Sequence, residues 1–270
     1  MRRIPFAALS ILAASRAGAA VLPERGFGLP RDVSLDGRHI DSLIHFTLIA
    51  IALIFAVVLA MLVWSVARRG RCASAAYDPG SRRSVFLLLG GVAAISVVVD
   101  GTLFVRTLED MNGIFWNFSG AEANPAAVRI EVNAHQWAWT ARYAGPDGKF
   151  NTPDDIVTLN DIRVPTGAPV VIQIASTDVI HSFYVPNLRV KRDAMPGMVN
   201  GLTFQAQVPG EYEIGCAQHC GPNHYKMRGI LTVLSPEQYR DWLATAGAIA
   251  LRAYDPDDAS AHWGWEWRSL

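Results

Sequence analysis

The sequence predicts a membrane-anchored, otherwise all-β chain, in which a two-helix transmembrane hairpin precedes a β-sandwich or barrel. Two observations support this fold class. The first 106 residues contain two long apolar segments, and from Val128 onward short β-like runs alternate with glycine and proline. The composition agrees, because 51% of the 270 residues are hydrophobic, only 18% are charged, and the mean hydropathy is +0.19. This balance is typical of membrane segments beside a folded domain and argues against a disordered chain.

The N-terminus has the three parts of a secretory signal peptide. Met1-Arg2-Arg3 is basic, residues 4–12 are mostly apolar, and Ala17-Gly18-Ala19 is a small-residue cleavage pattern. We therefore expect residues 1–20 to be a signal peptide and the chain after it to be exported. The alternative is an uncleaved amphipathic N-terminus.

Two membrane-spanning helices are expected within residues 40–106. The first covers about 43–66, where Thr47 is the one polar residue between Phe46 and Trp64. The second covers about 85–105 and includes Asp100, close to one end. About 20 apolar residues in a helix cross the hydrocarbon core of a bilayer, so both segments are long enough.

The loop between the two spans predicts their orientation. It is rich in arginine, and short Lys/Arg-rich loops stay on the cytoplasmic side. Both termini and the β domain are then expected on the periplasmic side of a bacterial-type plasma (inner) membrane, which agrees with the signal peptide. The arginines concerned are Arg68, Arg69, Arg71, Arg82 and Arg83.

The charge is divided unevenly along the chain. From Thr107 to Leu270 there are 18 acidic and 12 basic residues, a net charge of −6, and the chain as a whole is neutral with 24 of each. An acidic exported half excludes a general nucleic-acid binder and suits a basic protein partner.

Residues 124–246 are expected to form the exported β domain. Strand-like runs precede a helix that we expect to begin after Ser235 and to end at Gly247, and residues 247–270 form a C-terminal tail. The tail contains Trp263, Trp265 and Trp267, whose role the sequence leaves open. The predicted strands are Val128–Val132, Pro169–Ser176, Gly201–Val208, Glu211–Cys216 and Gly229–Val233.

A cluster of metal-binding residue types follows one of these strands. Cys216, Cys220, His224 and Met227 form a C-x3-C-x3-H-x2-M pattern within one loop. A disulfide between the cysteines, or a zinc site with a second histidine, would also suit an exported domain. The methionine favours copper, because thioether is a soft ligand that adds little to a zinc site. Two cysteines four residues apart can bridge two metal ions, with His181, 35 residues upstream, as a further nitrogen ligand.

These motifs make the chain resemble subunit II of the haem–copper cytochrome c oxidases, which carries the binuclear copper A centre in a cupredoxin-like domain. The resemblance rests on the two spans, residues 135–139 (HQWAW), the segment around His181, residues 191–197 (KRDAMPG) and the cysteine loop. These motifs occur in the order of the family and extend over most of the chain. No C-x-x-C-H pattern occurs in the sequence, so a fused haem c domain is not expected.

The resemblance implies a complete ligand set for two copper ions. The two cysteines would bridge the ions, the two histidines would be terminal ligands, and the thioether and one main-chain oxygen would be weak ligands. The residues concerned are Cys216, Cys220, His181, His224, Met227 and Gln218, the last through its main-chain oxygen.

Three further residues have implied roles. Trp137 matches the aromatic residue at which electrons arrive from cytochrome c, and Asp193 matches a residue at the contact with subunit I. Gln218 stands where the family usually has a glutamate that helps to hold an interfacial magnesium ion. Because an amide lacks the charge of a carboxylate, we expect magnesium binding to be weakened.

The function implied is that of the electron-accepting subunit of a terminal cytochrome c oxidase. The chain would take single electrons from a c-type cytochrome or a similar donor and pass them to haem in subunit I, where oxygen is reduced and protons are pumped. Its partners would be subunit I, other oxidase subunits, the donor and the lipid bilayer, and no nucleic acid. The alternatives are a copper A subunit of another reductase, such as a nitric oxide reductase, and a membrane-anchored copper carrier.

Overall fold

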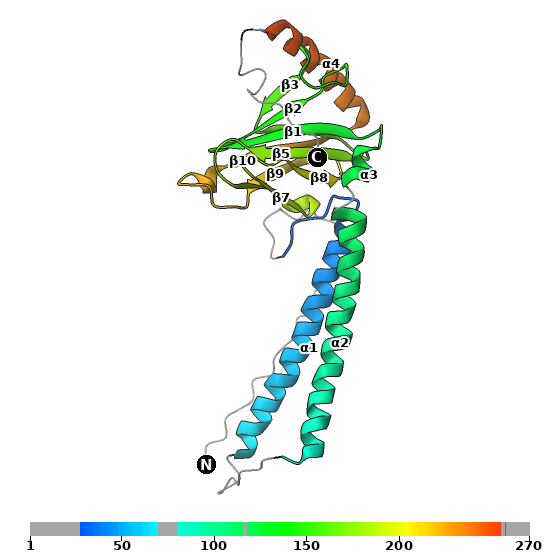
Figure 1. Cartoon of the computed structure of the whole chain (residues 1–270), viewed down its shortest axis with the longest axis vertical. Helices are drawn as coiled ribbons and strands as arrows, with labels where there is room; N and C mark the ends of the chain where they lie inside the picture. The colour runs from blue at the N-terminus through cyan, green and yellow to red at the C-terminus, as the bar shows by residue number, and fades with distance from the viewer. Residues whose placement is uncertain (1–27, 70–79, 116–117, 255–256, 258–270) are drawn as a thin grey trace, which may run out of the picture. The chain divides into compact units, whose positions relative to one another are not determined.

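The computed structural model describes residues 28–69, 80–115, 118–254 and 257 (Figure 1). Residues 28–31 belong to a first compact unit that ends at Arg31, and the second unit begins at Asp32. All described helices and strands belong to the second unit. The predicted signal peptide and most of the C-terminal tail lie outside the described residues.

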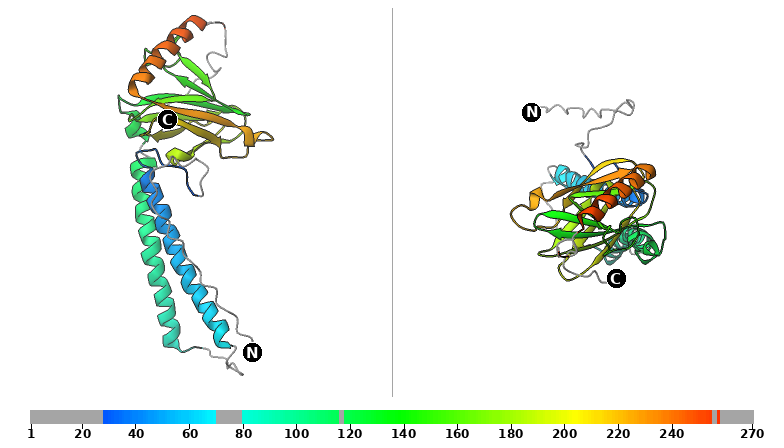
Figure 2. Two further views of the ribbon diagram at one scale, coloured as in Figure 1. Left: turned by 180° about the vertical axis from the view of Figure 1, so that it is seen from behind. Right: turned by 90° about the horizontal axis from the view of Figure 1, so that it is seen from above.

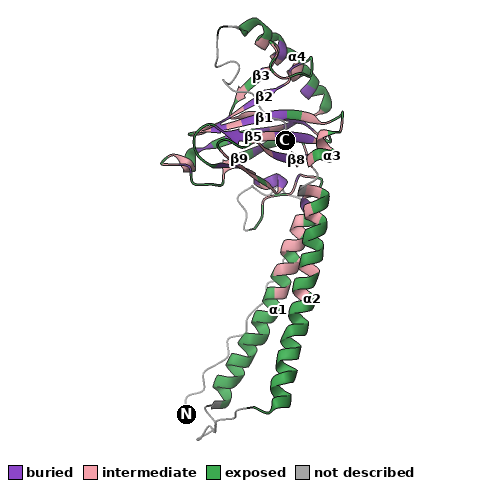
Figure 3. Cartoon of the chain, viewed as in Figure 1, coloured by how far each residue is buried: buried purple, intermediate pink, exposed green. Residues whose placement is uncertain are grey.

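Two long helices precede the β domain. Helix α1 comprises Gly37–Arg69 and α2 comprises Arg82–Asp110, and each is long and apolar enough to cross a bilayer. No described residue in the most apolar window of either helix is buried by the rest of the chain, as Figure 3 shows. Helices that expose apolar side chains over this length need lipid or another apolar partner around them.

The β domain is a sandwich of two five-stranded mixed sheets (Figure 2). The first has the order β3-β2-β1-β5-β8 and the second β4-β10-β9-β6-β7, and each contains one parallel pair, β1 with β5 and β4 with β10. The strands of the first sheet are β1 (Val128–His135), β2 (Ala138–Tyr143), β3 (Ile156–Leu159), β5 (Val170–Ser176) and β8 (Asn200–Phe204). Those of the second are β4 (Asp161–Pro165), β6 (His181–Val185), β7 (Val190–Ala194), β9 (Gly210–Cys216) and β10 (Arg228–Leu234). The predicted fold class, a helical hairpin followed by a cupredoxin-like sandwich, is confirmed.

Short helical segments complete the chain. They are η1 (Met111–Phe115), α3 (Phe118–Glu122), η2 (Pro186–Leu188), η3 (His224–Lys226) and the longer α4 (Pro236–Ala253).

The core lies between the two sheets and is built by alternating side chains. Strand β5, which lies between β1 and β8, departs from this alternation: it is buried at six of its seven positions, so both of its faces are covered. Trp139 and Phe183 are fully buried and meet edge to face, with ring centroids 5.3 Å apart. This contact joins the first sheet to the second, close to the predicted metal site.

The β1–β2 hairpin is fixed by a buried ion pair. Arg142 on β2 is fully buried, and its Nε donates to Glu131 on β1 at 2.7 Å. Its Nη1 donates to Asn151 at 2.9 Å, which ties the following loop to the same group. Breaking such a pair would leave a buried charge uncompensated, so the network holds the hairpin in one register. That register places residues 136–137 at the turn.

Helix α4 is capped as expected but runs further than expected. Ser235 accepts from the Gln238 backbone, and the Gln238 side chain accepts in turn from the Ser235 backbone, which forms a capping box. The helix continues beyond Gly247 to Ala253, because this glycine serves packing rather than termination. A Cβ at Gly247 would lie 2.7 Å from Pro146, so only glycine allows this approach.

Candidate metal centre

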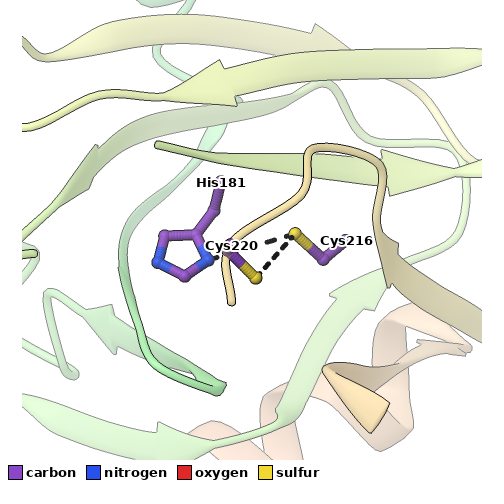
Figure 4. A group of neighbouring side chains, drawn as sticks. All are labelled: His181, Cys216 and Cys220. Carbon is purple, nitrogen blue, oxygen red and sulfur yellow. Dashed lines mark hydrogen bonds between the residues drawn. The ribbon is translucent and has the colours of Figure 1, made fainter. Parts of the chain in front are cut away.

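The site is assembled by the pairing of two strands of the second sheet. Cys216 is the last residue of β9, and the antiparallel register places it opposite Phe183 on β6. His181, the first residue of β6, therefore lies beside the loop that carries Cys220 (Figure 4). The main-chain N–H of Ala217 donates to the Ser182 carbonyl at 2.9 Å and fixes the start of this loop.

The two cysteines and the histidine converge on one point. The sulfurs of Cys216 and Cys220 are 3.7 Å apart, and one donor atom from each of the three residues lies within 4.8 Å of the others. Both cysteines are free, and this separation is far from the roughly 2.05 Å of a disulfide bond. The geometry therefore supports a metal site over a structural disulfide.

The other three predicted ligands lie at the same place. His224 Nδ1 is 3.5 Å from the Cys220 sulfur, and the Met227 sulfur is 3.1 Å from His181 Nδ1. The main-chain oxygen of Gln218 is 3.1 Å from the Cys216 sulfur. The structure thus brings together two thiols, two imidazoles, a thioether and a carbonyl, a soft donor set that fits copper.

The pKa shifts of Cys216 and Cys220 indicate that a cation would be needed to keep both sulfurs deprotonated. Burial disfavours the Cys216 thiolate, but hydrogen bonds with the His181 ring and the Ser182 backbone outweigh it and lower the pKa of Cys216 to about 6. Burial, reinforced by the neighbouring Cys216 sulfur, raises the pKa of Cys220. The first thiolate therefore opposes the second, and a bound metal cation is what would hold both deprotonated.

The centre is buried on one side and open on the other. His181, Cys220 and Met227 are at most 3% exposed, whereas Gln218 and His219 are exposed. The His219 ring contacts the His224 ring edge to face, with centroids 5.5 Å apart. The exposed arc of the loop is therefore the part of the site that a partner can reach.

Asp178 orients His181 and was missed by sequence reasoning. Its Oδ1 is 2.8 Å from His181 Nε2, so the other ring nitrogen, Nδ1, faces the sulfurs. Its Oδ2 accepts from the Gln136 backbone N–H at 2.6 Å. Burial is outweighed by hydrogen bonds from His181, Val179 and Gln136, which lower the pKa of Asp178, so it is a carboxylate. The D-x-x-H spacing is the sequence signal that could have indicated a contact between Asp178 and His181. The contact with Gln136 depends on the tertiary fold and has no such signal.

Trp137 lies against the cysteine loop. Its indole Nε1 donates to the Cys220 carbonyl at 3.2 Å, and Gln136 Nε2 donates to the same oxygen at 2.7 Å. Gly221 allows this approach, because a Cβ there would lie 2.9 Å from Gln136 and 3.3 Å from Trp137, and its φ is +115°. The half-buried indole is thus joined to a candidate ligand residue through one hydrogen bond.

Asp193 lies next to the other candidate ligand strand. It stands opposite Ser182 in the β6–β7 register, and Ser182 Oγ donates to its Oδ1 at 2.6 Å. This hydrogen bond lowers the pKa of Asp193. The side chain is 48% exposed and presents an ionised carboxylate on the strand that pairs with the strand of His181.

Taken together, the fold and the donor set indicate a class: a β-sandwich protein that follows two apolar helices and carries a candidate site for a soft metal. Comparison with known proteins narrows this class to one family. Residues 128–234 match the model of the family described as Cytochrome C oxidase subunit II, periplasmic domain. Residues 128–234 therefore resemble the periplasmic domain of cytochrome c oxidase subunit II, and they follow two apolar helices that are long enough to anchor them to a membrane.

The chain is also similar to individual proteins. An alternative cytochrome c oxidase subunit 2 of Bradyrhizobium diazoefficiens is 29% identical over 239 residues, which cover 78% of this chain and 81% of that protein. A cytochrome c oxidase subunit 2 of Synechocystis sp. is 34% identical over 117 residues, 43% of this chain and 32% of that protein. Among solved structures, the periplasmic domain of subunit II of cytochrome oxidase of Bradyrhizobium japonicum is 26% identical, with a TM-score of 0.42 over 47% of this chain and 97% of that one.

Replacing Asp178 with asparagine tests its role in orienting His181. The amide would keep the size of the side chain but lose the charge that holds the ring. We expect copper affinity to fall by about 10- to 100-fold, the usual cost of losing a partner of a metal-bound histidine. The measurement is competition for copper against a chelator of known affinity. Asp241→Asn, on α4 and away from the site, is the control, and equal affinity in both variants would contradict the assignment.

Proposed function

We propose that this chain is the electron-accepting subunit of a terminal cytochrome c oxidase. It takes single electrons from a c-type cytochrome at a binuclear copper A centre and passes them to haem in subunit I, where oxygen is reduced and protons are pumped. The chain itself carries out no oxygen chemistry. The convergence of two thiols, two imidazoles, a thioether and a carbonyl at one loop is the observation that carries the proposal.

The proposed ligands divide by strength. Cys216 and Cys220 would hold both ions, His181 and His224 would each hold one, and the Met227 sulfur and the Gln218 main-chain oxygen would be weaker ligands. This assignment is supported by distances of 3.1 to 4.0 Å among the donor atoms. When bound, the copper pair supplies a one-electron couple whose charge is spread over two ions.

The protein contributes a rigid frame. His181, Cys220 and Met227 are buried in the sandwich, and Asp178 holds the His181 ring from behind. Side chains held in this way do not rearrange when the charge of the centre changes by one electron. A small rearrangement keeps electron transfer fast, which suits a relay and not a carrier that must release its metal.

The two sides of the loop suit different partners. Trp137 touches the Cys220 carbonyl and is proposed to receive electrons from the donor. Asp193 is proposed to contact subunit I. Both termini and the copper domain are proposed to lie on the periplasmic side of the inner membrane, with the arginine-rich loop in the cytoplasm and a cleaved signal peptide at residues 1–20. The acidic balance of residues 107–270 would attract a basic donor.

The copper centre is tested by Cys216→Ser in the full-length chain purified in detergent. The unmodified chain should bind two copper ions and show one unpaired electron shared between them by electron paramagnetic resonance. The variant should lose the shared-electron signal, because a serine hydroxyl does not bridge copper as a thiolate does. Cys72→Ser, in the predicted cytoplasmic loop, should leave the signal unchanged. A chain that binds one zinc ion and gives no such signal would refute the proposal.

The role of Trp137 is tested by Trp137→Phe in the assembled oxidase. The change removes the indole hydrogen bond to the Cys220 carbonyl but keeps an aromatic ring. We expect electron input from cytochrome c to slow by about tenfold, about 1.4 kcal/mol in activation free energy. The copper signal should be unchanged.

Stopped-flow reduction with cytochrome c measures this rate. Trp242→Phe on α4, which packs against Tyr143 outside the site, is the matched control. Equal rates in the unmodified protein and the Trp137 variant would remove Trp137 from the electron path.

Gln218 is proposed to weaken interfacial magnesium and to leave copper intact. Its main-chain oxygen is unaffected by the side chain, whereas magnesium prefers charged or water oxygens. Gln218→Glu should therefore raise manganese retention by about tenfold, or about 1.4 kcal/mol, with no change in copper. Manganese, followed by its resonance signal, stands in for magnesium. Stoichiometric, tightly held manganese in the unmodified oxidase would contradict this proposal.

A further inference from the structure

A groove on the far part of the β domain lies between α4 and the edge strand β3. Its volume is about 500 Å³. One wall is formed by residues within 152–158, which include most of β3, and the other by the C-terminal half of α4. Ala246, Ala250 and Ala253 lie on this helical wall, and small side chains there leave room for a bulky occupant.

The rim of the groove is apolar and exposed. Ile249 is 60% exposed and Val157 is 47% exposed, and both line the groove. Strand β3 is at the end of its sheet and pairs with β2 alone among the described strands. An apolar groove beside an open strand edge is a surface that proteins usually cover.

The C-terminal segment of the sequence begins directly after a residue of this groove. Tyr254 lines it, and residues 255–270 follow directly. Their sequence contains Trp263, Trp265 and Trp267, separated by one residue each. A spacing of two places all three indoles on one face of an extended segment. Pro256 favours a break in the helix at the start of the segment.

The lengths allow the segment to return along the groove. From Trp242 to Tyr254 the helical wall is about 18 Å long at 1.5 Å per residue. The nine residues from Asp255 to Trp263 reach about 30 Å when extended. The three tryptophans can therefore lie beside the wall after a reversal of the chain.

We propose that residues 258–270 of the same chain dock in this groove as an extended segment. The indoles of Trp263, Trp265 and Trp267 pack against the alanine-lined wall of α4 and against Val157. A tether that begins at the groove gives its own segment a high local concentration, which a second copy or a lipid surface lacks. Buried indoles contribute large apolar contact areas, so a few of them suffice to hold such a segment.

The test is hydrogen exchange followed by mass spectrometry on the full chain in the assembled oxidase. Replacing Trp263, Trp265 and Trp267 together with alanine should speed exchange at least threefold in peptides that cover β3 and the end of α4. The matching replacement by phenylalanine should keep most of the protection. Equal exchange in the alanine variant and the unmodified chain would overturn the proposal.

A reciprocal variant changes the groove and leaves the segment intact. Ile249→Glu places a charge in the groove and should speed exchange in residues 260–268, whereas Leu251→Glu, on an exposed position of α4 that does not line the groove, should not. Protection that appears only in lipid nanodiscs would indicate membrane insertion, and protection that rises with protein concentration would indicate a second copy. Either result would overturn docking within one chain.

Discussion

The pairing of β6 with β9 is the constraint on which the site depends. These two strands pair through Phe183 opposite Cys216 and Tyr184 opposite Gly215, and this short contact sets His181 against the cysteine loop. The pairing is held from behind by Phe183, whose ring meets Trp139 of the other sheet. A shift of one residue would turn His181 out of the centre, since neighbouring side chains point to opposite faces. The core therefore specifies the metal centre as well as the stability of the domain.

The sulfurs of Cys216 and Cys220 impose a second constraint. At 3.7 Å they are close enough to bridge a metal but too close for two thiolates without a cation between them. The frame around them is nevertheless complete: Asp178 fixes one imidazole, Gln136 and Trp137 hold the Cys220 carbonyl, and Gly221 makes room for both. The contacts of Gln136 and Trp137 reach the candidate site from the β1–β2 turn of the first sheet, so the packing of the two sheets helps to position the cysteine loop.

Much of this arrangement could be predicted from the sequence. The cysteine loop is local, so its ligand types were visible in one stretch, and the fold class followed from apolar length and from strand-like runs. Asp178 and Gln136 could not be assigned, because their contact joins the β1–β2 turn to the loop between β5 and β6, 42 positions further along the chain. The extent of α4 was also wrong. Glycine commonly ends helices, but Gly247 is retained for its contact with Pro146, which belongs to a distant loop.

The candidate site has a buried part and an exposed part, and this division is relevant to the proposed function. Two residues outside the candidate ligand set contact it through one hydrogen bond each. The half-buried Trp137 donates to the Cys220 carbonyl, and the exposed Asp193 accepts from Ser182, the neighbour of His181. Trp137 lies in the turn between β1 and β2 of the first sheet, whereas Asp193 lies on β7 of the second sheet. In the proposed function, a donor at Trp137 and a receiving subunit at Asp193 would therefore contact different elements of the domain. For a relay that handles single electrons this separation matters, because the donor can exchange while the contact to the catalytic subunit is kept.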